Sequence, residues 1–187
     1  MTDNVDVLAR IDALITAVYR DRTYSPWEEG PMRAARFEQL FRERLPEWPL
    51  RNQTDLVYGG ATAISFLLHP GHYIGVPTPD GLEARISRLG GQCYQALLEI
   101  SHLGPFARIR FTRETFDRPT GELGYDEQDT PFLDEHLEFV YLLKRILLEE
   151  GIEVLPREVL DQPVPDVELD VTEVGRATVY HCLFDEE

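Results

Sequence analysis

Apolar residues recur at intervals of three to four positions in four stretches of the chain, and this spacing predicts amphipathic α-helices. The stretches cover residues 4–19, 31–45, 80–103 and 130–150. Pro31 suits the first turn of a helix, and Gly151 suits the position just after a helix ends. The third stretch contains Gly90-Gly91, which costs about 2 kcal/mol in a helix interior relative to two alanines. It is therefore either one helix with a weak point or two helices that meet there.

Five other stretches are rich in β-branched and aromatic residues or alternate between apolar and polar positions, and these features predict β-strands. They cover residues 62–68, 73–76, 106–113, 166–172 and 179–185. Residues 117–129 between them are polar and predict a loop. Together, the elements predict one α+β domain over residues 1–187, with an antiparallel or mixed β-sheet and amphipathic helices packed on it.

The length and composition of the chain limit the class of protein to which it can belong. A chain of 187 residues with 43% apolar content is large enough for one domain with a substantial core. No apolar run reaches the roughly 20 residues needed to cross a bilayer, and the first residues lack the pattern of a signal peptide. Two cysteines, Cys93 and Cys182, are too few for a disulfide framework. We therefore expect a cytoplasmic protein with reduced thiols.

The net charge of −16 comes almost entirely from one end of the chain. Residues 125–187 hold 18 of the 34 acidic residues and four basic ones, a charge of −14, which leaves −2 for residues 1–124. Such a charge disfavours nucleic acids and anionic membrane surfaces, because both attract Lys and Arg. It favours a basic protein partner, and it equally serves to keep the chain soluble.

Two groups of carboxylates in this acidic third are candidates for contact with a basic partner. The first group is Asp126, Glu127, Asp129, Asp134, Glu135 and Glu138, and the second is Asp166, Glu168 and Asp170. No row of basic residues in the sequence matches the first group. The second group lies on one face of a predicted strand at intervals of about 7 Å. It has three interpretations: pairing with Arg108 and Arg110 across strands, contact with a partner's cations, or part of a divalent-metal site without its usual lysine.

Cys93 offers an enzymatic alternative. The string Gly90-Gly91-Gln92-Cys93 places the thiol near a predicted helix N-terminus, where the pKa of a cysteine falls and the thiolate becomes a nucleophile. Over about 20 residues the string resembles the Gly-Gly-x-Cys segment of the arylamine N-acetyltransferases, which implies a cysteine acyltransferase or hydrolase. Leu89 stands where those enzymes carry an arginine, and the base at a suitable separation is His136. The competing interpretation makes Cys93 a small buried residue on one stripe with Leu97.

The remaining candidates for chemistry are weak. His69 and His72 flank a Pro-Gly turn, yet two nitrogens fall short of the four ligands that zinc takes, and the cysteines are not spaced to complete the set. The sequence contains no phosphate-binding loop, nucleophile elbow or metalloprotease motif. We therefore expect no metal and no cofactor.

Three functional hypotheses follow from these observations. The first is a non-enzymatic acidic domain that docks on a basic protein. In its size, acidity and α+β character the chain resembles the immunity proteins of bacteria, and this resemblance implies a toxin as the partner. The second is the cysteine acyltransferase or hydrolase. The third is an acidic accessory or structural subunit, in which the helix predicted over residues 130–150 forms the interface of a homodimer.

Overall fold

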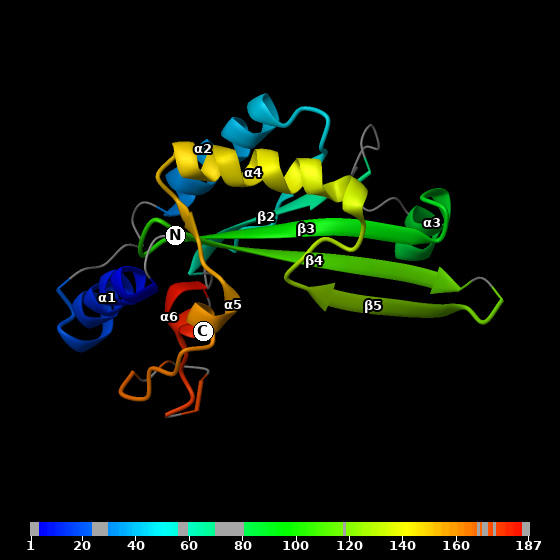
Figure 1. The fold of residues 1–187 in the computed structure, drawn as a ribbon. Helices are drawn as coiled ribbons and strands as arrows, with labels where there is room; N and C mark the ends of the chain where they lie inside the picture. Colours follow the sequence, from blue (N-terminus) through cyan, green and yellow to red (C-terminus); the bar gives the residue numbers. More distant parts are fainter. Residues whose placement is uncertain are drawn as a thin grey trace.

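The computed structural model describes residues 4–23, 30–55, 60–69, 81–117, 119–167, 169, 172–173 and 175–184. A six-stranded sheet lies at its centre, with β1 to β5 side by side in the order of the chain (Figure 1). The strands are β1 Leu50–Asn52, β2 Ala61–Leu67, β3 Gln92–Ser101, β4 Phe106–Asp117, β5 Glu122–Gln128 and β6 Glu153–Val154. The helices are α1 Asn4–Ile15, α2 Gly30–Arg44, α3 Gly81–Arg88, α4 Leu137–Glu149, α5 Arg157–Leu160 and α6 Val179–Phe184. A π-helical turn, η1 Thr16–Arg20, follows α1, and a 3-10 turn, η3 Asp134–His136, precedes α4.

The sheet is mixed. β1 to β5 pair antiparallel with their neighbours, whereas the short β6 pairs parallel with the start of β4, where Phe106 lies opposite Glu153. Helices pack against this sheet, so the α+β architecture predicted from the sequence is confirmed.

One face of the sheet is apolar and lies under α2 and α4 (Figure 1). Successive side chains of a strand point to opposite faces, and every second residue of β2, β3 and β4 therefore contributes to this core. Its largest fully buried side chains are Phe37, Phe41, Phe66, Phe111 and Phe139. The ring of Phe139 lies 5.1 Å from the rings of both Trp48 and Phe66, measured between centroids, which fixes α4 on the sheet.

The opposite face carries two smaller apolar clusters with polar residues between them. At one end, Ile86 of α3 packs with Leu67 and Cys93. At the other end, α1, α5 and α6 gather around Leu103 and Phe106. The middle of this face is lined by charged residues of β3 and β4, so the two faces of the sheet differ sharply in polarity.

The prediction of helix over residues 80–103 is wrong beyond Arg88. Gly90 and Gly91 adopt φ values of 84° and 93°, which glycine reaches without steric cost, and the chain then enters β3 at Gln92. The error has a physical cause. Most of β3 is buried on both faces, so its apolar residues are nearly continuous and periodicity cannot separate such a strand from a buried helix.

Four further predictions in the C-terminal part of the chain differ from the structure. The polar loop contains β5, whose exposed side chains give no apolar alternation and which is held by its backbone register with β4. The last long helix begins at Leu137, because Leu133 is extended (φ −129°, ψ 143°) and a 3-10 turn intervenes. The strand predicted over residues 179–185 is the short helix α6 over its described part, and in residues 166–172 the described pairing is one isolated bridge, between Leu169 and Thr172. The strand predicted over residues 73–76 lies outside the described residues.

Replacing Phe139 with alanine should lower the free energy of unfolding by about 3–5 kcal/mol, because the change removes a buried ring and leaves a cavity between Trp48 and Phe66. Chemical denaturation monitored by tryptophan fluorescence measures this loss. Met32→Ala, at an exposed position of α2, is the matched control and should change the free energy by no more than about 0.5 kcal/mol. Equal losses in the two variants would contradict the packing described here.

Candidate functional site

The outer face of α4 is the largest exposed apolar feature on one described element. The inner face of this helix buries Phe139, Leu143, Ile146 and Leu147. On the outer face, the exposed fractions are 52% for Leu137, 67% for Tyr141 and 75% for Leu148. With 100° between successive residues of a helix, these three and Lys144 fall within about 60° of one another. We call Leu137, Tyr141, Lys144 and Leu148 the outer stripe.

Carboxylates stand at the beginning of this helix. Asp134 and Glu135 belong to η3, Glu138 belongs to the first turn of α4, and all three are exposed. Acidic side chains are favoured there because backbone N–H groups at a helix start carry partial positive charge. Among the described residues, no Arg or Lys forms an ion pair with any of these three carboxylates. Their charge therefore faces solvent.

The other three carboxylates of the first group are paired within the chain. Asp126 of β5 lies opposite Arg113 of β4 in the sheet register, and Arg113 Nη2 donates to Asp126 Oδ2 at 2.6 Å. Arg110 donates to both oxygens of Glu127 at 3.1 Å. The expectation that this group has no matching basic row is therefore wrong for half of it, because the β4–β5 hairpin brings the arginines alongside.

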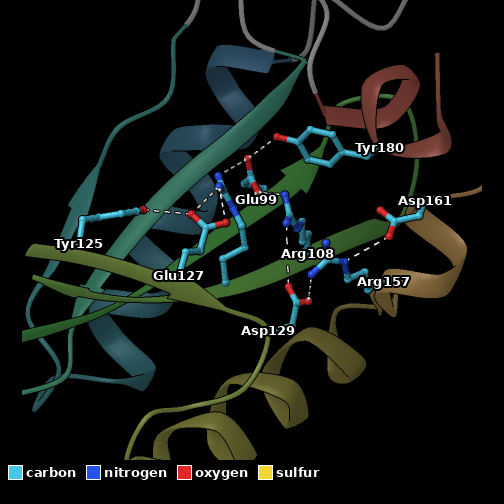
Figure 2. A network of polar contacts seen from close by, with 9 residues as sticks. Glu99, Arg108, Tyr125, Glu127, Asp129, Arg157, Asp161 and Tyr180 are labelled. Atoms are coloured by element: carbon cyan, nitrogen blue, oxygen red, sulfur yellow. Dashed lines mark hydrogen bonds and ion pairs between the residues drawn. The ribbon is translucent and has the colours of Figure 1, made fainter. Parts of the chain in front are cut away.

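Asp129 completes this internal pairing. Its carboxylate lies 3.9 Å from Arg108 and 3.7 Å from Arg157, which also binds Asp161 at 3.2 Å (Figure 2). Contact of Asp126, Glu127 and Asp129 with a partner stays a prediction, and it requires these pairs to open.

Of the second group of carboxylates, the structure describes Asp166. Asp166 accepts hydrogen bonds from Arg20 at 2.6 and 3.0 Å, and these bonds lower the pKa of Asp166. For Asp166, the interpretation that pairs this group with Arg108 and Arg110 is therefore wrong. Glu168 and Asp170 lie outside the described residues.

A buried carboxylate, Glu99 of β3, organises the polar face of the sheet. It is only 8% exposed, and Arg110 donates to both of its oxygens at 3.1 and 3.2 Å. Arg108 lies 3.8 Å from Glu99, and its guanidinium covers the ring of Tyr180 at 4.7 Å. The Tyr180 hydroxyl in turn donates to Glu99 at 3.4 Å (Figure 2). Glu99 thus links β3 and β4 to the C-terminal helix α6.

The charges in this network satisfy one another. Burial alone would lower the pKa of Arg110, but Glu99 and Glu127 raise it, with a net upward shift. Tyr125 donates from its hydroxyl to Glu127 at 3.0 Å, so the network extends to β5. Such a cluster holds separate elements together, although Arg108 Nε is buried without a hydrogen-bond partner. We therefore assign Glu99, Arg108 and Arg110 a structural role.

The structure separates the two residues of the enzymatic alternative. Cys93 lies on β3, fully buried with Leu67 and Ile86 at the α3 end of the sheet, and no helix begins near it. The next residue, Tyr94, faces the other side and packs against the ring of His136 at 5.2 Å. Cys93 and His136 thus lie on opposite faces of the sheet. The prediction of a helix N-terminus that activates Cys93 is wrong. The geometry also does not bring Cys93 and His136 together as nucleophile and base.

His136 is buried at the start of α4. Burial lowers its pKa, whereas Glu135 at 3.8 Å and a hydrogen bond with the backbone of Leu68 act in the opposite direction. Its Nδ1 atom is buried without a hydrogen-bond partner. His102 is also buried, and burial and Arg33 lower its pKa. Both rings therefore resist protonation more than an ordinary histidine does.

The described residues offer little for a metal or small molecule. No three His, Cys, Asp or Glu side chains among them come together as metal ligands, and of the turn histidines His72 lies outside them. An open hollow of about 500 Å³ lies beside the β4–β5 hairpin, lined by Gly90–Gln92, Thr115–Asp117 and Glu122–Gly124. Every helix in the described part of the chain is too short or too polar to cross a membrane.

Comparison of the chain with models of protein families, with curated proteins and with solved structures gave no significant match. The function is therefore argued from the residues. Sequence reasoning missed Glu99 and the outer stripe. The spacing of Leu137, Tyr141 and Leu148 was visible, but a single apolar face was assumed for the helix.

Replacing Glu99 with glutamine should lower the free energy of unfolding by about 3 kcal/mol, because two largely buried guanidinium groups lose their shared countercharge. Urea denaturation gives the value. Asp126→Asn, which removes the carboxylate of the exposed pair with Arg113, is the matched control and should have little effect. If both variants lost the same amount, Glu99 would not be the centre of the network.

Stability should fall as pH is lowered from 7.5 to 5.5. The unfolded state takes up a proton at each histidine near the ordinary pKa of 6.5, whereas the folded state, with lowered pKa values at His136 and His102, resists uptake. The stabilising contribution of these histidines is complete above pH 6.5 and is lost on acidification. Urea midpoints measured across this range test the sign. His136→Gln should reduce the slope, and an unchanged slope would show that the ring titrates normally.

Proposed function

We propose that this chain is a non-enzymatic protein-binding domain that docks on a basic partner through the carboxylates at the start of α4. The observation that carries the proposal is that Asp134 and Glu135 are exposed and form no ion pair with a described Arg or Lys, whereas several other acidic residues are paired internally. Carboxylates that solvate freely in the isolated chain can accept Lys and Arg from another protein. Their long-range attraction speeds association at low salt.

The charge of the whole chain supports the same proposal. At −16 it attracts a basic protein from a distance, so the partner approaches before short-range contacts form. Two exposed carboxylates on a short turn then set the docking position. If the basic partner is a toxin, as for an immunity protein, the function is inhibition of that toxin. The carboxylates then occupy the site that an anionic substrate of the toxin would take. This version of the proposal rests on the general resemblance of the chain to immunity proteins in size, acidity and fold class.

The double reversal Asp134→Lys/Glu135→Lys should abolish capture of the partner, because it replaces attraction with repulsion at the docking position. Wild type and variant are immobilised and exposed to extract of the source cells at low and high salt, and retained proteins are identified by mass spectrometry. The control Glu47→Lys/Glu122→Lys makes the same change in net charge at exposed positions elsewhere. Glu138 is left intact because it borders the outer stripe.

A basic protein retained by wild type and by the control, but lost with the docking-site variant, supports the proposal. With the purified pair, the association rate should fall about tenfold or more between low and high salt. Equal retention by all three proteins, or a rate that does not depend on salt, would refute the assignment.

A further inference from the structure

We propose that the outer stripe of α4 is the interface of a homodimer, in which the α4 helices of two copies pack antiparallel. The inference goes beyond the basic partner and concerns a different part of the helix. Its basis is the spacing of the stripe, the charges that flank it, and the identity of the only lysine in the chain.

The spacing of the stripe is that of a coiled-coil seam. Leu137, Tyr141, Lys144 and Leu148 are separated by four, three and four residues, the alternation by which positions a and d of a heptad stay on one face of a helix. All four side chains are exposed in the isolated chain. The helix therefore has a second face suited to another helix.

The charge at the centre of the stripe disfavours a basic protein as its partner. Lys144 stands in its middle, Arg145 flanks it, and Lys144 forms no ion pair with another described residue. The centre of α4 is thus locally positive in a strongly acidic chain. A basic partner would be repelled there.

The flanking charges also fix the direction of pairing. In the heptad set by the stripe, Glu138 and Arg145 occupy successive e positions, while Val140 and Leu147 occupy the g positions. Antiparallel helices related by a two-fold axis bring e positions together, so Glu138 of each copy meets Arg145 of the other. Parallel helices would bring e positions against the apolar g positions and form no charge pair.

The two ionic groups are available for this contact. Glu138 is exposed and forms no ion pair with a described residue. Arg145 lies 3.8 Å from Glu149, but Glu149 has a closer partner in Arg44 at 2.7 Å. Within one helix, Glu138 and Arg145 are seven residues or about 10 Å apart, too far to pair with each other. Their complementarity is therefore between copies.

The same axis aligns the rest of the stripe. It passes midway between Leu137 and Leu148, and therefore between Tyr141 and Lys144. Lys144 of one copy then lies near Tyr141 of the other, where a cation–π contact stabilises the ammonium group. Leu137 meets Leu148 of the other copy at each end. Four side chains from each copy form a small interface, so we expect a weak dimer that is populated only at high protein concentration.

Sedimentation velocity of the full chain over a range of concentrations tests the dimer, together with a charge-swap series. Wild type should shift from monomer to dimer as its concentration rises. Glu138→Arg and Arg145→Glu should each weaken the dimer tenfold or more, because each sets like charges opposite one another. The double variant Glu138→Arg/Arg145→Glu should restore it. Far-UV circular dichroism confirms that each variant keeps its helices.

Leu148→Arg provides a second disruption if a swap variant fails to fold, because position 148 is exposed and a basic residue near a helix C-terminus does not harm the helix. Met32→Ala, also at an exposed apolar position, should leave the dimer intact. A wild-type chain that stays monomeric, a dimer indifferent to these changes, or a double variant that fails to recover would overturn the proposal. The variant Asp134→Lys/Glu135→Lys should still dimerise. The dimer proposal and the basic-partner proposal can therefore be refuted separately.

Discussion

The packing of α4 on the apolar face of the sheet is the constraint on which the other features depend. Phe139 sits between Trp48 and Phe66, and this contact sets the rotation of the helix about its own axis. Once the inner face is fixed, Leu137, Tyr141 and Leu148 have no route to the core, because a helix directs opposite sides of its surface in opposite directions. Their exposure is a consequence of the fold and not of a loosely packed end.

The arginines of the chain explain how so acidic a sequence folds. A net charge of −16 repels itself in the compact state, and the chain offsets part of this repulsion by placing arginines between carboxylates of separate elements. Arg110 joins Glu99 to Glu127, and Arg20 binds both Asp12 and Asp166. Arginine suits such positions because its planar group serves two carboxylates at once. The carboxylates left outside these pairs are the ones available to a partner.

The sequence predicted the elements with one buried face, and it also predicted β2, which is buried on both faces, but it failed for β3 and β5. In α1, α2 and β4, exposed and buried positions recur at regular intervals, so the spacing of their apolar residues identified the type of element. β3 is largely buried on both faces and was predicted as a helix, while β5 is almost entirely exposed and was predicted as a loop. Prediction of the candidate site failed for a related reason. Whether Glu127 is free depends on Arg110 across the hairpin, and that pairing appears only once the register of β5 is known.

The two proposed surfaces lie on adjacent elements, the 3-10 turn η3 and the helix α4 that follows it directly. Asp134 and Glu135 precede Leu137 by less than one turn, so they stand at the outer ends of an antiparallel α4 pair and outside its seam. Reversal of direction between the copies sets the two acidic turns at opposite ends of the dimer. A dimer of this kind holds two docking positions for basic partners and does not bury either. The proposed dimer and the proposed partner contact are therefore compatible, because the dimer would use the outer stripe of α4 and the partner would use Asp134 and Glu135 of η3.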